Sequence, residues 1–336
     1  MSDPLVVIDA DVLGRHRTGD ETYVTELLRA LPAVGDGLRF VAITRHPELV
    51  PPGVEPIVLP GRIQELRMAV RVPLLLRRLR PALAHFVHSL PLVLPCPAVL
   101  TVQDLSFERD ASLMGARETA IFRFVVPRSA LRAVRVLAIS QRTKTDLVEL
   151  YGLPPEKVSV TPLAYDPAFR PGGTRGDYLL LAGSIEERKN PLLAADAAQA
   201  TGRKLVVVGP ERDAALVAEL RRRGADVRGF VSQEELVRLY QEAAALLFPT
   251  RYEGFGLPVV EAMAAGTPVI ATPDAAVREV GGDAVAYAEP GDFVEAVQRV
   301  LADPEPWSRA GLERARVFSW EETARRTVAV YREALA

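Results

Sequence analysis

Two glycine-containing segments of the sequence carry charged residues in spacings that suit an anionic ligand. In the first, Gly254 and Gly256 interrupt the run Pro249–Pro258, and Glu261 follows eight residues after Glu253. The glycines let the backbone come close to a ligand, and the helix expected after them would present N–H groups and the positive end of its dipole. This segment favours phosphate binding beside two carboxylates. The alternative is a tight turn with two solvated glutamates.

The second segment is the loop Gly183–Pro191, in which Arg188 and Lys189 stand just before a predicted helix. Cations are unfavourable at a helix N-terminus unless an anion is close. A flexible ammonium beside a bidentate guanidinium suits a diphosphate. Ion pairs with Glu186 or Glu187 are the alternative explanation. Because both segments follow predicted parallel strands, we expect their anion-binding groups at the same edge of one sheet.

Other catalytic and metal-binding patterns are missing or weak. The sequence has no G-x-G-x-x-G after the first strand of either half, no G-x-x-x-x-G-K-[ST] and no G-x-S-x-G, which disfavours dinucleotide, P-loop and hydrolase chemistry. Asp9 and Asp11 could bind a metal, but we interpret them as the end of a strand, with Asp9 tying down the next loop. No two histidines have the i, i+4 spacing of a zinc motif, so we predict no metal site. His88 follows a strand, where it could face a ligand or be buried.

The composition excludes several classes of protein. The chain has 336 residues, of which 49% are hydrophobic and 25% charged, as in an ordinary folded protein of about two domains. Its 41 Lys and Arg against 43 Asp and Glu do not match a nucleic-acid binder. Cys96 is the only cysteine, which excludes an internal disulfide. We find no signal peptide and no apolar run of about 20 residues, so we expect a cytoplasmic protein.

Short apolar runs alternate with amphipathic segments, which predicts parallel strands covered by helices on both faces. The predicted strands are Leu5–Asp9, Leu38–Thr44, Val54–Leu59, Leu83–Val87, Ala98–Val102, Val136–Ile139, Tyr178–Ala182, Lys204–Val208, Ala244–Phe248 and Pro268–Ala271, with a strand-like Val158–Thr161. A proline- and glycine-rich stretch from Gly152 to Gly176 separates two sets of strands. The fold class is therefore α/β, with two Rossmann-like, doubly wound domains in tandem.

Residues 249–270, with Glu253 and Glu261 in an E-x7-E arrangement, resemble the signature of retaining glycosyltransferases of the GT-B fold, glycosyltransferase family 4. Three further segments resemble that family's diphosphate-binding loop, acceptor-side segment and C-terminal tail: Glu187–Asn190, Thr101–Phe107 and Phe318–Trp320. The resemblance covers nearly the whole chain. It implies two domains facing each other across a cleft, with residues 1–165 on the acceptor side, residues 166–317 binding the donor, and residues 318–336 packing back on the first domain.

The resemblance implies transfer of a hexose, with retention, from a nucleotide-diphosphate sugar (GDP-mannose-like or a UDP-hexose) to a sugar or lipid-linked sugar acceptor. It implies no metal and no cofactor, and a place in polysaccharide or glycoconjugate biosynthesis. By analogy Arg188 and Lys189 would neutralise the leaving diphosphate, Glu253 would position the donor sugar, and Glu261 would bind the ribose. The full set implied to contact the donor is Gly19, Ser184, Arg188, Lys189, Glu253, Gly254, Phe255, Gly256, Leu257 and Glu261. Gln103 and Asp104 would lie on the acceptor side.

The chain departs from the family pattern in two places. The first loop is commonly T-G-I-G-R-Y but here reads Thr18–Tyr23, with two acids that suit a helix N-terminus and repel a phosphate. Gln103 stands where many members have a histidine before the aspartate. His88 is the residue predicted to supply the protonatable, catalytic group instead. A nucleotide-sugar-binding protein with weak or no catalysis therefore stays as the alternative function, whereas a Rossmann oxidoreductase is disfavoured.

Residues 62–80 form a basic and apolar segment. It contains Arg62 and five further arginines against one acid, Glu65, with nine large apolar residues among them. Pro73 is expected to break or kink any helix there. Such a segment can lie on an anionic bilayer, which predicts at most a weak, salt-sensitive contact with the inner membrane face. The alternative, which the sequence favours, is a domain helix with a core-facing apolar side and solvated arginines.

Overall fold

The computed structural model describes residues 3–15, 18–61, 63–109 and 116–336. The chain divides into two compact units, each with its own parallel sheet. Unit 1 comprises Met1–Leu163 together with Ser319–Ala336, and unit 2 comprises Ala164–Phe318. The first part of unit 1 ends at Leu163, two residues before the predicted domain boundary at residue 165. Unit 2 ends at Phe318, one residue after the predicted boundary at residue 317.

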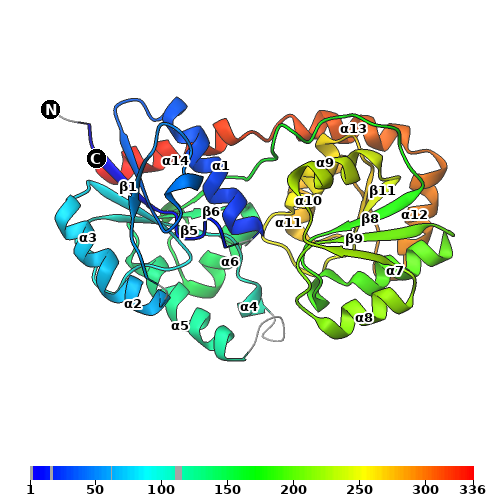
Figure 1. Ribbon diagram of the computed structural model, residues 1–336, viewed down its shortest axis with the longest axis horizontal. Coiled ribbons are helices and arrows are strands. Elements are labelled where there is room, and N and C mark those ends of the chain that lie inside the picture. The colour runs from blue at the N-terminus through cyan, green and yellow to red at the C-terminus, as the bar shows by residue number, and fades with distance from the viewer. Residues whose placement is uncertain (1–2, 16–17, 62, 110–115) are drawn as a thin grey trace. The chain divides into compact units, whose positions relative to one another are not determined.

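Unit 1 is built on a seven-stranded parallel sheet with the order β3-β2-β1-β4-β5-β6-β7 (Figure 1). Its strands are β1 (Leu5–Asp9), β2 (Arg39–Thr44), β3 (Glu55–Val58), β4 (Leu83–Val87), β5 (Ala98–Val102), β6 (Arg135–Ala138) and β7 (Val158–Val160). Its helices are α1 (Thr18–Val34), α2 (Gln64–Leu66), α3 (Val72–Leu79), α4 (Ser106–Arg109), α5 (Ala116–Arg132), α6 (Gln141–Tyr151) and α14 (Trp320–Leu335), with a π-helical turn, η2, at Arg67–Arg71. Helix α14 packs against α1, although it follows unit 2 in the sequence.

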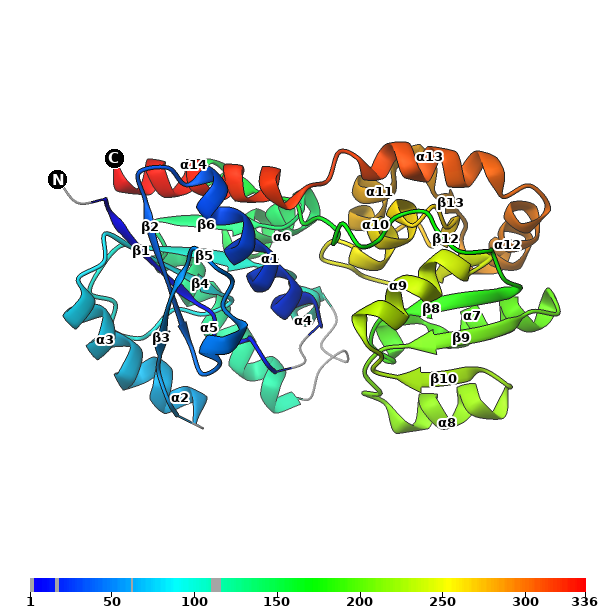
Figure 2. The same ribbon diagram turned by 45° about the horizontal axis from the view of Figure 1, so that its top comes forward.

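Unit 2 is built on a six-stranded parallel sheet with the order β10-β9-β8-β11-β12-β13 (Figure 2). Its strands are β8 (Tyr178–Ala182), β9 (Lys204–Val208), β10 (Asp226–Gly229), β11 (Ala245–Phe248), β12 (Val269–Ala271) and β13 (Ala286–Tyr287). Its helices are α7 (Pro191–Ala200), α8 (Ala214–Arg222), α9 (Gln233–Glu242), α10 (Leu257–Ala264), α11 (Ala275–Gly281), α12 (Phe293–Ala302) and α13 (Glu305–Ala315), with a 3₁₀ turn, η5, at Glu187–Lys189. The strands β8 and β11 are direct neighbours, so the loops that follow them leave the same edge of the sheet.

The predicted fold class is confirmed, since both sheets are parallel and doubly wound. Every predicted strand is present, with ends that shift by at most one residue, and the strand-like Val158–Thr161 forms β7. The strands β10 and β13 were not predicted. Both lie at sheet edges, where strands are short and less apolar, and β10 has the sequence Asp-Val-Arg-Gly.

The basic segment of unit 1 is helical on both sides of Pro73, but the regular α-helix is interrupted by the π-helical turn η2 directly before α3. Pro73 has no N–H to donate to the residues before it, and the widened turn accommodates it. There the N–H of Val72 bonds to the carbonyl of Arg67, five residues back. Arg62 lies outside the described residues. Within the described ranges no helix is long and apolar enough to cross a membrane.

Candidate active site

The two glycine-containing loops of unit 2 lie against each other at the carboxyl ends of β8 and β11. The N–H of Arg251 donates to the carbonyl of Arg188 over 2.9 Å, which joins the loops directly. A third loop, after β9, approaches equally closely: a Cβ atom on Gly209 would lie 2.0 Å from the carbonyl oxygen of Gly183. Because no side chain fits there, glycine at position 209 is required for the three loops to converge.

Glu253 is the centre of the charged groups at this edge. Lys189 Nζ lies 2.5 Å from Glu253 Oε1, and Arg188 Nη1 lies 3.3 Å from Glu253 Oε2. The hydroxyl of Thr250 donates to Oε1 over 2.7 Å. Glu253 is only 6% exposed, so its charge is held by these partners rather than by bulk water. The predicted convergence of Arg188, Lys189 and Glu253 at one sheet edge is therefore observed.

Burial and ion pairing have opposite effects on the pKa of the Glu253 carboxyl group. Burial alone would raise the pKa of Glu253, but the charges of Lys189 and Arg188 outweigh it and lower that pKa below its ordinary value. Burial also lowers the pKa of Lys189, and the nearby Arg188 adds to this effect, while Glu253 opposes it. The result is a carboxylate that stays ionised at neutral pH between two cationic side chains.

Arg188 is also held on its other side. Its Nη2 donates to Glu186 Oε1 over 2.7 Å, and its Nη1 donates to the carbonyl of Tyr252 over 2.7 Å. The hydroxyl of Ser184 donates to the same Glu186 oxygen over 2.9 Å. The alternative that Arg188 pairs with a glutamate of its own loop is thus observed together with the pairing to Glu253. The guanidinium is fixed in place before any ligand arrives.

Helix α10 begins directly behind this cluster. Its N-cap, Gly256, has φ 109°, a left-handed conformation that favours glycine and turns the chain from the loop into the helix. The side chain of Phe255 turns inward and meets Phe318 edge-to-face, with 5.8 Å between ring centroids. The side chain of Phe255 is therefore taken up by this contact, and the prediction that the backbone of Gly254–Leu257 lines the donor stays a prediction.

Glu261 lies in the second turn of α10, whereas Glu253 lies in the loop before that helix. The hydroxyl of Tyr240, from α9, donates to Glu261 Oε2 over 2.8 Å. Burial raises the pKa of Glu261 to about 7, with Asp166 adding to the rise and the Tyr240 hydrogen bond opposing it. The two glutamates of the predicted signature thus have different electrostatic environments: Glu253 is ionised and paired with cations, and Glu261 titrates near neutrality.

The remaining predicted site residues belong to unit 1. His88 directly follows β4 and has a backbone φ of 62°. Its imidazole Nε2 lies 3.4 Å from Asp20 Oδ1, and its backbone N–H donates to the carbonyl of Thr101. A Cβ atom on Gly19 would lie 3.7 Å from Gln103 Oε1. Unit 1 therefore gathers His88, Gly19 and Gln103 near the start of α1. Glu21 accepts a hydrogen bond from the N–H of Gly14 over 2.7 Å, so one of the two extra acids ties the first loop together.

Asp104 has a structural task of its own. Its Oδ1 accepts hydrogen bonds from the N–H of Ser106 over 3.1 Å and from the Ser106 hydroxyl over 2.8 Å. These contacts cap the start of α4, as aspartate commonly does before a helix. The acceptor-side role of Asp104 stays a prediction.

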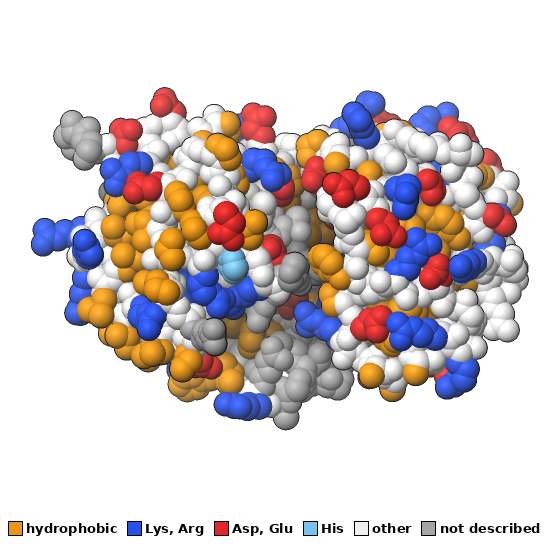
Figure 3. All heavy atoms as spheres, in the orientation of Figure 1, with side chains coloured by type: hydrophobic (Ala, Val, Ile, Leu, Met, Phe, Trp, Pro, Cys, Tyr) orange, Lys and Arg blue, Asp and Glu red, His pale blue; other side chains and the backbone are white. Residues whose placement is uncertain are grey.

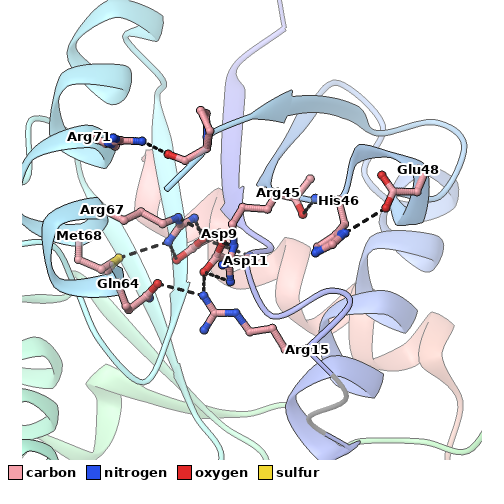
Figure 4. Close-up of polar contacts among 12 residues, drawn as sticks. Asp9, Asp11, Arg15, Arg45, His46, Glu48, Gln64, Arg67, Met68 and Arg71 are labelled. Carbon is pink, nitrogen blue, oxygen red and sulfur yellow. Dashed lines mark hydrogen bonds and ion pairs between the residues drawn. The ribbon is translucent and has the colours of Figure 1, made fainter. Parts of the chain in front are cut away.

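Arginines surround the Asp9-Ala10-Asp11 motif (Figure 4). Asp9 pairs with the buried Arg67, and the N–H of Asp11 donates to Asp9 Oδ1 over 3.4 Å, so Asp9 does tie down the following loop. Asp11 pairs with Arg15 and Arg45, the latter over 2.8 Å from Nε to Oδ1. The carboxylates face cationic side chains in this arrangement. Across the described ranges no three His, Cys, Asp or Glu residues are placed to hold a metal ion together.

Sequence reasoning missed two contributors to the unit 2 site, Thr250 and Tyr240, whereas Glu186 was named as a possible partner in its own loop. Thr250 lies three residues from Glu253, so a search for hydrogen-bonding neighbours would have found it. Tyr240 stands 21 residues from Glu261 on another helix. No local spacing in the sequence connects that pair.

Family models match both halves of the chain. The model described as Glycosyltransferase Family 4 matches residues 17–169, and the one described as Glycosyl transferases group 1 matches residues 176–303. The chain is 33% identical over 233 residues to an MMP alpha-(1->4)-mannosyltransferase of Mycolicibacterium hassiacum, covering 62% of this chain and 56% of the relative. It is 31% identical over 280 residues to D-inositol 3-phosphate glycosyltransferase 1 of Catenulispora acidiphila, covering 71% of this chain and 67% of the relative.

Solved structures share the fold at low sequence identity. Sucrose-phosphate synthase from Thermosynechococcus elongatus matches with a TM-score of 0.77 and 19% identity, covering 98% of each chain. Anabaena HepE in complex with UDP and glucose matches with a TM-score of 0.73 and 14% identity, covering 98% of this chain and 99% of that one. The aligned segments span 56% to 60% of the first three curated relatives. With both halves matched and a relative of 31% identity covered over two thirds of its length, the chain belongs to glycosyltransferase family 4 and has the GT-B fold.

Proposed function

We propose that the protein is a retaining hexosyltransferase that uses a nucleotide-diphosphate sugar and requires no metal. The observation that carries this proposal is the convergence of Arg188 and Lys189 on Glu253, from loops that follow two neighbouring strands. Two fixed cations at the edge of a parallel sheet suit a diphosphate, which leaves with a growing negative charge. The matched residues of the family pattern take the same roles.

The charge arrangement supports a specific sequence of contacts. Without donor, Glu253 neutralises both cations. An arriving diphosphate competes for Arg188 and Lys189, which leaves Glu253 free to accept hydrogen bonds from the sugar hydroxyls. During transfer the acceptor oxygen bonds to the anomeric carbon on the face from which the diphosphate departs. The leaving oxygen keeps the electron pair of the broken bond and takes the acceptor's proton, so the configuration is retained.

The unit 1 residues fit the acceptor side of this proposal. His88 beside Asp20 remains the residue proposed to supply the protonatable group that Gln103 lacks. Relatives bear the names of mannosyltransferases and inositol-phosphate glycosyltransferases, and HepE holds UDP and glucose. These names support transfer of a hexose; the proposed donor is GDP-mannose-like or a UDP-hexose, and the proposed acceptor is a sugar or lipid-linked sugar. A weakly catalytic nucleotide-sugar binder of the same fold is the second candidate, favoured by the acids of the first loop.

A donor panel tests the proposal. The protein is incubated with GDP-mannose, UDP-glucose, UDP-galactose and other nucleotide sugars, and released nucleoside diphosphate is measured. We expect nucleoside diphosphate to be released from donors that carry one particular nucleotide base. The anomeric configuration of the product, read by proton NMR, should equal that of the donor. The rate is expected to survive EDTA, because Arg188 and Lys189 supply the positive charge that a metal would otherwise bring. A rate that collapses with EDTA and returns with Mg²⁺ or Mn²⁺ would contradict metal independence. A raised melting temperature with nucleotide but no turnover would favour the binding protein.

The pKa of Glu261 predicts how donor binding depends on pH. If its carboxylate accepts hydrogen bonds from the ribose hydroxyls, only the ionised form binds well, and its pKa in the free protein is about 7. Affinity for the nucleoside diphosphate should therefore be about tenfold weaker near pH 6 than near pH 8. Glu261→Gln cannot titrate and should remove this difference, as measured by calorimetric titration. Titration of the ligand's own phosphate affects both proteins equally.

The matched control for this experiment is Glu234→Gln, on the exposed first turn of α9. It makes the same chemical change away from the site and should keep the pH dependence of the unaltered protein. Equal pH dependence in the unaltered protein and in Glu261→Gln would show that Glu261 does not bind the ribose.

A further inference from the structure

The segment Gln64–Leu79 of unit 1 has two apolar faces. One consists of the buried Val72 and Leu76, which pack in the core of the sheet. The other consists of Leu66, Val70 and Leu74, which are 45%, 44% and 58% exposed. A core helix with merely solvated arginines accounts for the first face only. The second face needs a different explanation.

The spacing of the exposed residues places them in one row. Leu66, Val70 and Leu74 follow one another at intervals of four, and residues four apart in a helix lie on the same face. Ile63, also exposed, extends the row at its beginning.

Exposed arginines lie at the end of this row. Arg77, Arg78 and Arg80 are exposed, and none of them forms an ion pair with any residue that the structure describes. The arginines at the end of α8 in unit 2 differ in this respect: Arg221, Arg222 and Arg223, which directly follows the helix, pair with acidic side chains. The positive charge on α3 is therefore available to an external anion.

Helix α5 continues this surface. Val126 and Ala130 of α5 belong to the same core cluster as Val72 and Leu76 of α3, so both helices cover the same face of the sheet. The outward side of α5 and the adjoining loop again combine large apolar and basic residues, all exposed: Ile121, Phe124, Leu131, Leu92, Arg117, Arg123, Arg128 and Arg132. In Figure 3 hydrophobic and basic side chains intermingle at the lower left, over the elements that Figure 1 labels α2, α3 and α5.

We propose that this outer surface of α2, α3 and α5 docks on an anionic lipid bilayer. Seven arginines are exposed on this surface, namely Arg77, Arg78, Arg80, Arg117, Arg123, Arg128 and Arg132, so it complements anionic headgroups. Exposed Leu, Phe and Val between the arginines can enter the interface while the guanidinium groups stay at the headgroups. The inference is independent of the proposed sugar donor.

Co-sedimentation with lipid vesicles tests this surface. The full chain is mixed at low salt with phosphatidylcholine vesicles that contain about one third phosphatidylglycerol, and with pure phosphatidylcholine vesicles. We expect pelleting with the first and little with the second, and loss of pelleting at high salt, where the Debye length is short. No pelleting with the anionic vesicles at low salt would overturn the proposal.

Two sets of substitutions separate the charge from the apolar row. Arg77→Gln, Arg78→Gln and Arg80→Gln together should weaken binding by about 100-fold, because each arginine contributes about fivefold near an anionic surface. Leu66→Ser, Val70→Ser and Leu74→Ser should also weaken it, and should leave the melting temperature close to that of the unaltered protein since all three are exposed.

Matched control variants lie in unit 2. Arg221→Gln, Arg222→Gln and Arg223→Gln remove the same charge from α8, and Phe230→Ser removes a large apolar side chain that is 62% exposed. Both should bind vesicles like the unaltered protein. Equal losses in the unit 1 and unit 2 variants would mean that net charge alone drives binding and would overturn the assigned surface. A concentration-dependent dimer abolished by the serine substitutions would identify a second copy of the chain as the occupant instead.

Discussion

Arg188→Ala and Lys189→Ala are each expected to lower the turnover of sugar transfer by roughly 10²–10³-fold. Both side chains are fixed before the donor binds: Arg188 by Glu186 and the carbonyl of Tyr252, and Lys189 by Glu253. Fixed cations contribute most where charge grows during the reaction, and here it grows on the departing diphosphate. Nucleoside diphosphate release under saturating donor measures the effect.

The control for these variants is Arg251→Ala. Arg251 belongs to the same pair of loops, but its guanidinium is 56% exposed and pairs only loosely with Glu187, over 3.3 Å. Its removal should leave turnover within a few-fold of the unaltered protein, as for a screened surface pair. Melting curves establish that all three variants fold. Near-normal turnover in both Arg188→Ala and Lys189→Ala would exclude a catalytic role for this loop.

Acidification is expected to destabilise unit 1 through His85. This histidine is buried between β5 and α14, 2.5 Å from the Tyr331 hydroxyl and 2.7 Å from the Thr101 hydroxyl. Burial lowers the pKa of His85 from 6.5 to about 3. At a pH between about 3 and 6.5, His85 therefore binds a proton in the unfolded chain but not in the folded chain. The free energy of unfolding should therefore fall as the pH drops below 6.5, by about 2 kcal/mol near pH 5 and by about 4 kcal/mol near pH 3.

Urea unfolding at several pH values measures this effect. In a Trp307→Phe background Trp320 is the only tryptophan, so its fluorescence follows unit 1. His85→Gln should lose about 2 kcal/mol of the pH dependence between pH 7 and pH 5, since only this group differs. His46→Gln, at a partly exposed histidine of the same unit, is the matched control and should keep it. An unchanged slope in His85→Gln would refute the assignment.

The fold was predictable wherever a strand is buried on both faces. The central strands β8 and β11 consist of uninterrupted apolar residues, which no solvated segment tolerates. The edge strands β10 and β13 carry little of that signal, because one side of an edge strand needs no apolar partner. Pro73 indicated an interruption of the helix but not its form. A π-helical turn precedes α3, and nothing in the residue types of 67–71 predicts such a turn.

The site was predictable to the extent that its residues are neighbours in a loop. The loops that follow neighbouring parallel strands leave the sheet at one edge, and this rule predicted that Arg188, Lys189 and Glu253 lie close together. Asp104 illustrates the limit of predicting a site from the sequence. Its carboxylate oxygen could bind a ligand or accept a hydrogen bond from the N–H of Ser106 at the start of α4, and the sequence does not decide between the two. The roles of these residues toward donor and acceptor stay predictions.

The placement of α14 has a consequence for the order in which the chain acquires its structure. A ribosome makes residues 319–336 after all of unit 2, yet these residues complete unit 1, where Tyr331 supplies a hydrogen-bond partner to His85. Domains generally fold as units during synthesis, with the first one emerging first. Here the second unit is complete in sequence while the first still lacks the helix that packs against α1. The unit that begins the chain is thus the last to be finished.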